Sequence, residues 1–579
     1  MKKVILVFQF VPVMAFCSII ALYGHDSGQI SSPAKTGDIV ITEIMADPVP
    51  AVELPSEEYI EIFNRSEKAI NLKNWKLSSV DQNSFFPAVV ISPGEYLILT
   101  AVTDTSLFTS YGRTVGLKPF PALTDKGRII VLSDEQGNLI SGVEYSSAWY
   151  GSTLKSGGGW SIEMIDTDFP FFAEGNWEAS SSRKGGTPGS KNSSVRSNPD
   201  NSFSGIVNVF PKDSIRIFIE FSEPVPEFTT YISGITLDES GISAAGLSDP
   251  LFRRFILTPG NHLEKGEVYT ICLPESVADF AGNSASLRCF SFGLPESAGK
   301  NDLVFNELLF NPLPECPDYI EFFNKSEKVL DATEFLIVSI NSDTGMPSEA
   351  KQFSNEQRCI IPGAYYAITS DREKVISGYT SSVPENIFNV SYLPSMPDDR
   401  GRLLLLNRYL DKIDEVIYTE KMHYSLLSGN EGISLEKIRP DLPSDESISW
   451  HSASESSGWG TPGAQNSVFS REEPADEKLV FSSQKISPDN DGYEDVLVID
   501  INTGDPGSTI TVTLFDETGS YIKRIVENYL AGDRAAIVWD GTAEDGSPVR
   551  TGIYIVLTEM YNASGKTEKW KKVIAVVRR

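Results

Sequence analysis

The residues of this chain best suited to acid–base chemistry are glutamates in two pairs, Glu43 with Glu61 and Glu307 with Glu321. Glycoside hydrolysis uses two such carboxylates, one as acid and one as base or nucleophile. A structural role is favoured, however, because a period of two places Glu61 on the same sheet face as Tyr59. There it would be a half-buried carboxylate bonded to backbone amides or to an arginine. We therefore predict that Glu61 and Glu321 are not catalytic.

The sequence supplies no other catalytic machinery. Its four histidines are well separated and form no HExxH or Cys/His spacing, so a histidine-based metal centre has little material. There is also no Gly-x-Ser-x-Gly elbow, no Cys/His pair and no phosphate-binding loop. The sequence predicts a protein that is not an enzyme.

An acidic segment near the C-terminus could hold a metal ion. Asp489, Asp491, Glu494 and Asp495 surround Gly492, and oxygen ligands about a glycine turn suit Ca²⁺. The EF-hand pattern is not met, because its twelfth position holds an aspartate instead of a glutamate and no flanking helices are expected. An Asx-rich hairpin turn is the alternative. Calcium is the one cofactor that the sequence suggests.

Aromatic residues gather around the glycines at 157–159, where Trp149, Tyr150 and Trp160 lie close in sequence. Exposed rings would form a flat platform on which a sugar could stack. Packing in the core or at the edge of a β-sandwich is the favoured interpretation.

Length and charge set the class of protein. A chain of 579 residues implies about three to six domains, and 40% hydrophobic residues with 10% aromatics argue against disorder. The formal net charge of −30 repels phosphate backbones, which disfavours a nucleic-acid partner. No segment after the N-terminus has 18 consecutive apolar residues, so no membrane span is expected there.

The N-terminus resembles a secretory signal. Two lysines precede an apolar stretch to about Leu22, and we predict cleavage after Gly24 to remove residues 1–24. An uncleaved anchor and a lipoprotein acylated at Cys17 are the alternatives, although bulky Phe16 disfavours the second. The protein is predicted to be exported to the cell surface or to the extracellular space.

Four cysteines follow the signal, an even number in an exported chain. Cys272 and Cys289 flank the turn at 279–283 almost symmetrically, so a hairpin would pair them with Cα atoms about 4.4 to 6.8 Å apart. Cys316 and Cys359 occur together in a repeat whose first copy has neither, which suggests a second disulfide. Four free buried thiols are the alternative.

A long internal repeat organises the chain. Residues 59–68 reappear as 319–328 with eight of ten positions identical, and the match extends to units near 37–192 and 302–467. Short Val, Ile, Tyr and Phe runs with period two, punctuated by Gly, Pro, Asn and Asp, predict a β-sandwich in each.

Both units resemble the lamin-tail domain. The resemblance rests on the Glu-Tyr-Ile-Glu-Ile-Phe-Asn segment at 58–64, a Pro-Gly before a Tyr-containing strand, and a Gly-Thr-Pro-Gly close at 186–189 followed by Asn192. The family's fold is immunoglobulin-like. It implies adhesion, scaffolding or matrix association, since these domains in exported bacterial proteins often accompany catalytic modules as targeting appendages.

Two further β units complete the chain. Residues 203–297, with Phe-Ser-Glu-Pro-Val at 221–225 and Asp-Phe-Ala-Gly-Asn at 279–283, resemble the bacterial Ig-like domain of surface-layer proteins. Residues 479–579 contain Ser-Pro-Asp-Asn-Asp-Gly at 487–492, Trp-Asp-Gly at 539–541 and Gly-Ile-Tyr at 552–554, and with these motifs they resemble the Ig-like domain of flagellar hook-capping proteins and type IX sorting domains. The terminal Lys-Lys-Val-Ile-Ala-Val at 571–576 favours the second resemblance. An ordinary terminal Ig-like domain is the alternative. We expect Lys571–Val577 to form the last strand.

The sequence thus predicts an all-β protein of four tandem Ig-like β-sandwich domains. We expect a non-enzymatic binding or structural protein, an adhesin or scaffold, whose partner is a surface or matrix protein or polysaccharide. The alternative is a carbohydrate-active enzyme or carbohydrate-binding protein that uses Glu61 or Glu321 beside exposed aromatics.

Overall fold

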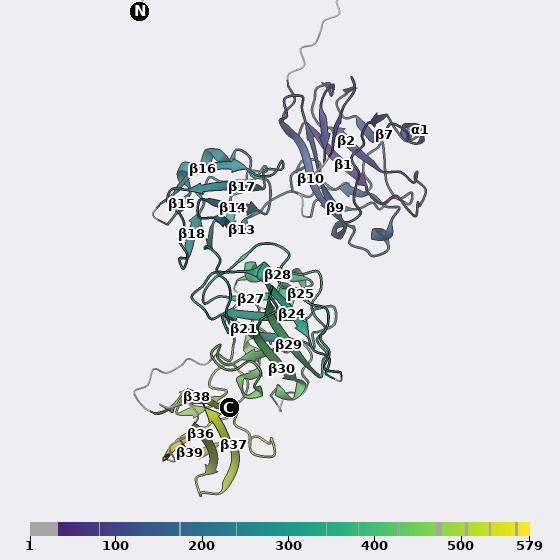
Figure 1. Cartoon of the computed structure of the whole chain (residues 1–579). Helices are drawn as coiled ribbons and strands as arrows, with labels where there is room; N and C mark the ends of the chain where they lie inside the picture. The colour runs from purple at the N-terminus through teal and green to yellow at the C-terminus, as the bar shows by residue number, and fades with distance from the viewer. Residues whose placement is uncertain are drawn as a thin grey trace, which may run out of the picture. The chain divides into compact units, whose positions relative to one another are not determined.

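The computed structural model of the chain is almost entirely β-structure (Figure 1). It describes residues 33–79, 82–172, 175–238, 240–342, 344–379, 381, 383–424, 427, 429–469, 478–503, 508–531, 534–561 and 566–578. The chain divides into two compact units, one ending at Pro199 and the other beginning at Asp200. The predicted signal peptide, residues 1–24, lies outside the described residues.

The first unit is a β-sandwich. One sheet has six strands in the order β12-β11-β1-β2-β7-β8, a second has four in the order β10-β9-β4-β5, and β3 pairs with β6. The strands are β1 (Ile39–Met45), β2 (Tyr59–Asn64), β3 (Ile70–Asn71), β4 (Lys76–Ser78), β5 (Asn83–Phe85), β6 (Val90–Ile91), β7 (Tyr96–Ala101), β8 (Thr114–Leu117), β9 (Gly127–Ser133), β10 (Leu139–Ser146), β11 (Ile162–Met164) and β12 (Trp177–Ala179). The helices are α1 (Thr105–Phe108), η1 (Ser147–Tyr150) and η2 (Lys155–Gly157).

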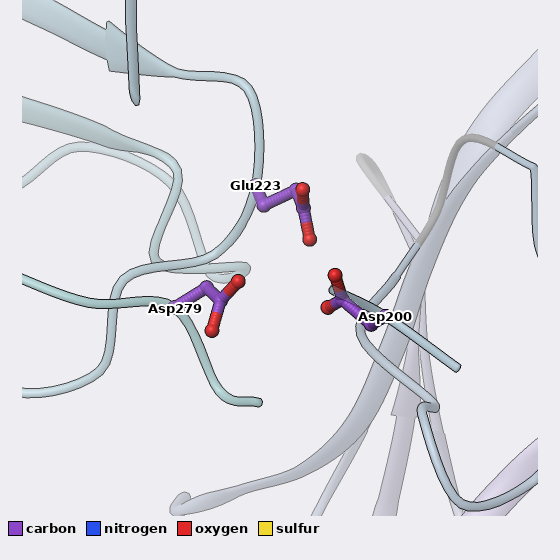
Figure 2. A group of neighbouring side chains, drawn as sticks. All are labelled: Asp200, Glu223 and Asp279. Carbon is purple, nitrogen blue, oxygen red and sulfur yellow. The ribbon is translucent and has the colours of Figure 1, made fainter. Parts of the chain in front are cut away.

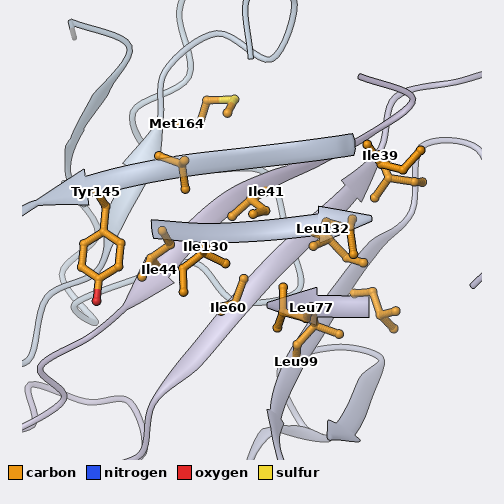
Figure 3. Packing of buried hydrophobic residues seen from close by; sticks show 14 of the residues in the cluster. Ile39, Ile41, Ile44, Ile60, Leu77, Leu99, Ile130, Leu132, Tyr145 and Met164 are labelled. Atoms are coloured by element: carbon orange, nitrogen blue, oxygen red, sulfur yellow. The ribbon is translucent and has the colours of Figure 1, made fainter. Parts of the chain in front are cut away.

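The core of this sandwich is made by alternate residues of facing strands, many of them Ile and Leu (Figure 3). On β1, Ile39 and Ile41 enter the core, but the next core residue is Ile44 and not Glu43. A β-bulge between Ile41 and Glu43 causes this shift, because an extra residue moves every later side chain to the opposite face. The bulge therefore turns Glu43 away from the apolar core.

The second unit begins with an eight-stranded Ig-like sandwich. Its sheets have the orders β16-β17-β14-β13-β19 and β15-β18-β20. The elements are β13 (Phe203–Asp213), β14 (Arg216–Phe221), η3 (Phe228–Gly234), β15 (Thr236–Leu237), β16 (Ile242–Leu247), β17 (Arg254–Pro259), β18 (Tyr269–Cys272), β19 (Ala285–Leu287) and β20 (Cys289–Phe292). Phenylalanines dominate its core, with Phe221, Phe228 and Phe255 in mutual ring contact.

The next sandwich repeats the topology of the first unit strand for strand, as the sequence repeat predicts. Its sheets are β28-β27-β22-β21-β31-β32, β25-β24-β29-β30 and β23-β26. The strands are β21 (Leu303–Leu309), β22 (Tyr319–Asn324), β23 (Leu330–Asp331), β24 (Phe335–Ser339), β25 (Lys351–Gln352), β26 (Cys359–Ile360), β27 (Tyr365–Thr369), β28 (Ile387–Asn389), β29 (Arg400–Asn407), β30 (Lys412–Thr419), β31 (Leu435–Lys437) and β32 (Trp450–Ser452). The helices are η4 (Ala332–Glu334), α2 (Arg372–Gly378), η5 (Pro384–Asn386), η6 (Glu420–Met422), η7 (Ser447–Ser449) and η8 (Glu455–Ser457).

A fourth sandwich ends the chain, with sheets β33-β35-β38 and β34-β40-β39-β36-β37. Its strands are β33 (Leu479–Phe481), β34 (Lys485–Ile486), β35 (Leu497–Asn502), β36 (Ser508–Asp516), β37 (Tyr521–Ala531), β38 (Arg534–Trp539), β39 (Gly552–Tyr561) and β40 (Thr567–Val576). The predicted last strand is present, although it begins four residues earlier than expected. It pairs antiparallel with β39 and buries Ile574 and Val576, leaving Val573 and Val577 exposed.

The all-β class of tandem Ig-like sandwiches is confirmed. Among the residues that the structure describes, no helix is long and apolar enough to cross a membrane.

Candidate functional site

Glu43 and Glu61 lie directly opposite each other on β1 and β2. Both face away from the apolar core of the sandwich, and both side chains are completely buried. Segment 186–194, which follows the last strand of the unit, covers this face and donates hydrogen bonds to the carboxylates. The prediction that Glu61 is half-buried is therefore wrong: the covering segment removes it from solvent altogether.

The Glu43 carboxylate is saturated by donors of the chain itself. Tyr59 Oη donates to its Oε1 at 2.7 Å, Ser161 Oγ at 2.5 Å and the Thr187 backbone N–H at 2.8 Å. Glycine at 186 lets the segment approach this closely, because a Cβ there would lie 2.5 Å from Tyr59 Oη.

Glu61 is bonded in the same manner. Thr42 Oγ1 donates to its Oε1 at 2.9 Å, and the Gly189 N–H donates to its Oε2 at 2.6 Å. The bond from a backbone amide is as predicted. The alternative of an arginine partner is wrong for the described part of the chain, where hydroxyl and amide groups satisfy this carboxylate.

A third glutamate, which the sequence analysis missed, completes the cluster. Glu163 on β11 is paired with Glu43 across the sheet and is also fully buried. It accepts hydrogen bonds from Thr187 Oγ1 at 2.9 Å and from the Ser194 N–H at 2.9 Å. The repeat carried a signal for it, since Ser-Ile-Glu at 161–163 matches Ser-Leu-Glu at 434–436.

The second copy rebuilds this arrangement with Glu307, Glu321 and Glu436, all fully buried. The Thr461 N–H donates to Glu307 at 2.9 Å and the Gly463 N–H donates to Glu321 at 2.6 Å, so the second Gly-Thr-Pro-Gly segment acts as the first does. Other donors to Glu307 and Glu436 are Tyr319 Oη, Ser434 Oγ, Ser467 Oγ and the Val468 N–H.

One position differs between the copies. Asn306 replaces Thr42, and its Nδ2 donates to Glu321 at 2.8 Å where the threonine hydroxyl donates to Glu61. The substitution therefore keeps the donor while it changes the residue type. We call each set of three glutamates a buried glutamate cluster.

Burial makes the clusters unlike ordinary carboxylates. It raises the pKa of Glu43 to about 7, with a further contribution from the charge of Glu163. Burial and then the charge of Glu307 raise the pKa of Glu436 to about 8. The pKa of Glu61 also lies well above its usual range, through burial first and Glu43 second. Raised pKa values suit a general acid, but these carboxyl groups have no exposed surface through which a substrate could reach them.

The aromatic residues near 157–159 pack as the favoured interpretation predicts. Tyr150 is buried and its hydroxyl donates to the Trp160 carbonyl at 3.1 Å. Trp149 stacks on Trp177 with ring centroids 5.9 Å apart, and the Trp160 ring lies under Lys155 Nζ. These rings form no exposed stacking platform in the described part of the chain.

Of the four predicted metal ligands near the C-terminus, three lie close together and one does not. Ligand atoms of Asp489, Asp491 and Asp495 lie within 4.8 Å of one another. Asp495 accepts backbone N–H bonds from Asn490 at 2.6 Å and from Gly492 at 2.8 Å, which is how an Asx-rich turn is built. Glu494 does not join them, because it pairs with Lys485 at 3.1 Å.

The predicted Cys272–Cys289 disulfide is confirmed. The two residues pair directly across β18 and β20, with Cα atoms 4.1 Å apart, slightly below the expected range. The predicted Cys316–Cys359 bond is wrong, because both thiols are free. Cys316 packs near Tyr379, whereas Cys359 is buried on β26 in a different apolar cluster.

The family model of the Lamin Tail Domain matches residues 32–147 of the chain. No curated protein matches the chain at a significant level. Among solved structures, the N-terminal part of the bacterial S-layer protein SbsC aligns at 17% identity over 37% of this chain and 43% of its own, with a TM-score of 0.15. A tetra-tandem repeat of a large adhesion protein aligns at 10% identity over 93% of this chain and 99% of its own, with a TM-score of 0.13.

The chain spans about half the length of the S-layer proteins that it matches. TM-scores this low do not establish a shared overall arrangement, so the family match carries the comparison. Residues 32–147 are thus similar to a Lamin Tail Domain, as the motifs of the repeat predict.

Proposed function

We propose that this protein is an exported, non-enzymatic binding or structural protein that acts at the cell surface or outside the cell, as an adhesin or scaffold. The observation that carries the proposal is the complete burial of Glu43, Glu61, Glu307 and Glu321, whose oxygens are bonded by the chain's own donors. The carboxylates that looked most like catalytic groups hold loops against sheets. The Lamin Tail Domain match supports the same conclusion.

A carbohydrate-active enzyme is the competing function. It would need two carboxyl groups in an open cleft, about 5 to 10 Å apart, on either side of a glycosidic bond. Both glutamate clusters lie under a covering segment instead, and the aromatic rings of the first unit pack against its core. The geometry therefore favours binding through surfaces other than these clusters.

The deciding experiment is a hydrolysis screen of the purified full-length protein on polysaccharides, with Glu61→Gln and Glu321→Gln as variants. We expect no turnover from any of the three. Hydrolysis by the wild type that falls roughly 10²-fold or more in either variant would be the effect of losing a general acid or base, and would overturn the proposal.

We also propose that residues 479–579 form a type IX sorting or anchoring domain. The order of elements supports it: β39 is followed by a lysine-led last strand, β40, that completes the sheet. A calcium ion at Asp489, Asp491 and Asp495 also stays a prediction. It is supported by the closeness of the three carboxylates and opposed by the backbone N–H groups that already donate to the Asp495 oxygens.

A further inference from the structure

Three carboxylates from separate segments meet at one end of the sandwich formed by β13–β20, which begins the second unit (Figure 2). Asp200 lies just before β13, Glu223 just after β14, and Asp279 in the turn that precedes β19. One oxygen from each lies within 4.8 Å of the others, and the side chains face one another. Two ligands on opposite sides of one Ca²⁺ are about 4.6 to 5.2 Å apart, so the spacing fits a shared ion.

The three residues are buried, with exposures of 7% for Asp200, 8% for Glu223 and 5% for Asp279. Within the described part of the chain, none of them forms an ion pair with a lysine or arginine. Three buried carboxylates repel one another strongly, since the interior screens charge weakly. The charge of Arg253 opposes this repulsion at Glu223 but acts on it less than either aspartate does. A proton or a cation must relieve this repulsion.

Glu223 distinguishes this group from an ordinary acidic turn. The Asn283 side chain donates to Asp200 and Asp279 at 3.0 Å each, and the Asn283 N–H donates to Asp279 at 2.8 Å. Among the described residues no N–H or hydroxyl group donates to Glu223; its carboxyl group lies at hydrogen-bonding distance from that of Asp200 and points at the two aspartates. Two carboxyl groups this close need a proton or a cation between them, because two ionised carboxylates have no donor to share.

The electrostatics of the three carboxyl groups favour a bound cation. Burial, followed by the charges of Asp200 and Asp279, raises the pKa of Glu223 to about 8. Burial and then Asp279 also raise the pKa of Asp200. A divalent ion among the three groups would lower their pKa values again, because a nearby positive charge favours the ionised carboxylates.

We propose that Asp200, Glu223 and Asp279 form a calcium site. The bound ion would hold the segment that precedes β13 against the end of the β13–β20 sandwich. The chemistry selects Ca²⁺: three carboxylates supply up to six oxygens, and Ca²⁺ accepts irregular sets of six to eight. Mg²⁺ demands a near-octahedral shell and usually keeps several waters and only one or two carboxylate ligands, which suits three converging, buried carboxylates less well. The site is independent of residues 489–495 and of the proposed function.

The test is calcium binding by the full-length protein, measured by titration calorimetry with CaCl₂ after EDTA treatment. Glu223→Gln removes one ligand charge, and Asp200→Asn does so outside the strands, where folding is least at risk. Glu264→Gln is the matched control, because Glu264 is an exposed glutamate of the same domain and is at least 15 residues from each of the three ligands in the sequence. Asp491→Asn separately reports any ion bound in the C-terminal segment.

We expect Glu223→Gln and Asp200→Asn to weaken one calcium site by about 100-fold or more, since outer-sphere partners alone change affinity about 10- to 100-fold. Glu264→Gln and Asp491→Asn should leave that site unchanged. In EDTA, the melting temperature of Glu223→Gln should equal or exceed that of the wild type, because the variant has one fewer carboxylate in the group. In calcium, the wild type should have the higher melting temperature, because it binds the ion more tightly. Equal calcium affinity and stoichiometry in the wild type, Glu223→Gln and Asp200→Asn would overturn the proposal, as would a wild type that binds no calcium.

Discussion

At the scale of single residues, each buried glutamate cluster depends on glycines that let the covering segment approach. A Cβ at Gly186 would lie 2.5 Å from Tyr59 Oη and 2.7 Å from Glu43 Oε1, and a Cβ at Gly460 would lie 2.5 Å from Tyr319 Oη. Such distances are closer than real atoms tolerate. The glycine of the Gly-Thr-Pro-Gly motif thus serves packing, while the threonine and second glycine serve as donors.

The first prediction is that Gly186→Ala destabilises the first unit by about 1–3 kcal/mol, the usual cost of overpacking a tight site. The measurement is urea unfolding of the full-length protein, with hydrogen exchange of β1 and β2 to locate the effect. Gly157→Ala is the matched control, because nothing lies within 4 Å of its added Cβ. Equal stability of the two variants would contradict the packing role.

The second prediction concerns pH. The pKa of Glu43 is raised from 4.5 to about 7, so the folded state binds more protons than the unfolded state between these values. The free energy of unfolding must then fall as the pH rises from 4.5 through 7. Each unit of pKa corresponds to about 1.4 kcal/mol, so the loss is on the order of 3 kcal/mol.

Hydrogen exchange of β1 and β2 between pH 5 and 8, corrected for intrinsic rates, measures this loss. Glu43→Gln should flatten the dependence, because the amide does not titrate and still accepts the bond from the Thr187 N–H. Glu57→Gln, which changes an exposed glutamate, should follow the wild type. A Glu43→Gln profile parallel to the wild-type profile would show that this carboxyl group does not titrate as described.

At the scale of elements, β-bulges and the last strand decide which side chains are buried. The bulge in β1 reappears in β21 between Phe305 and Glu307, so both copies turn their first glutamate to the covered face. In β40, pairing with β39 selects the face of Ile574 and Val576 for the core. Pairing register therefore separates residues that look equivalent in the sequence.

The third prediction uses two neighbouring residues of β40. Ile574 is fully buried, so Ile574→Ala should cost about 2–5 kcal/mol of stability in the C-terminal sandwich. Val573 is 55% exposed, and Val573→Ala should change the stability of this sandwich by about 0.5 kcal/mol or less. Thermal unfolding of both variants provides the comparison. If Val573→Ala were the more damaging, the register of β40 against β39 would be wrong.

At the scale of the whole molecule, the chain is a series of sandwiches in which one architecture occurs twice. The two repeated sandwiches share sheet order, bulge position and glutamate cluster, although 260 residues separate Tyr59 from its counterpart Tyr319. The repeated feature of the two modules is therefore a set of buried glutamates that hold a covering segment against a sheet.

The fourth prediction is that residues 479–579 carry an inert exported reporter to the cell surface in a host with the type IX route. A sorting domain acts on whatever precedes it, whereas an ordinary Ig-like domain leaves the reporter in the periplasm. Surface labelling and protease accessibility measure the location. Ile574→Ala in the fusion controls for folding, and periplasmic retention of a folded wild-type fusion would reject the sorting role.

The sequence by itself determined the features that depend on neighbouring residues. Period-two runs predicted strands, near-identical segments at 59–68 and 319–328 predicted duplicated sandwiches, and the even spacing of Cys272 and Cys289 about a turn predicted their disulfide. The strands and the duplication follow from local order and repetition. The cysteines meet on β18 and β20 although the segment between them is not a simple hairpin, because β19 lies within it and pairs with β13.

Only the tertiary structure decided which polar groups meet. Thr187 donates to Glu43 across 144 residues of sequence, and Asn283 reaches Asp200 across 83. The burial of Glu61 depends on a covering segment 128 residues away, which explains why periodicity alone placed it half in solvent. Such contacts follow from how segments cross one another in space, and the alternation of side chains along a strand contains no information about the crossing.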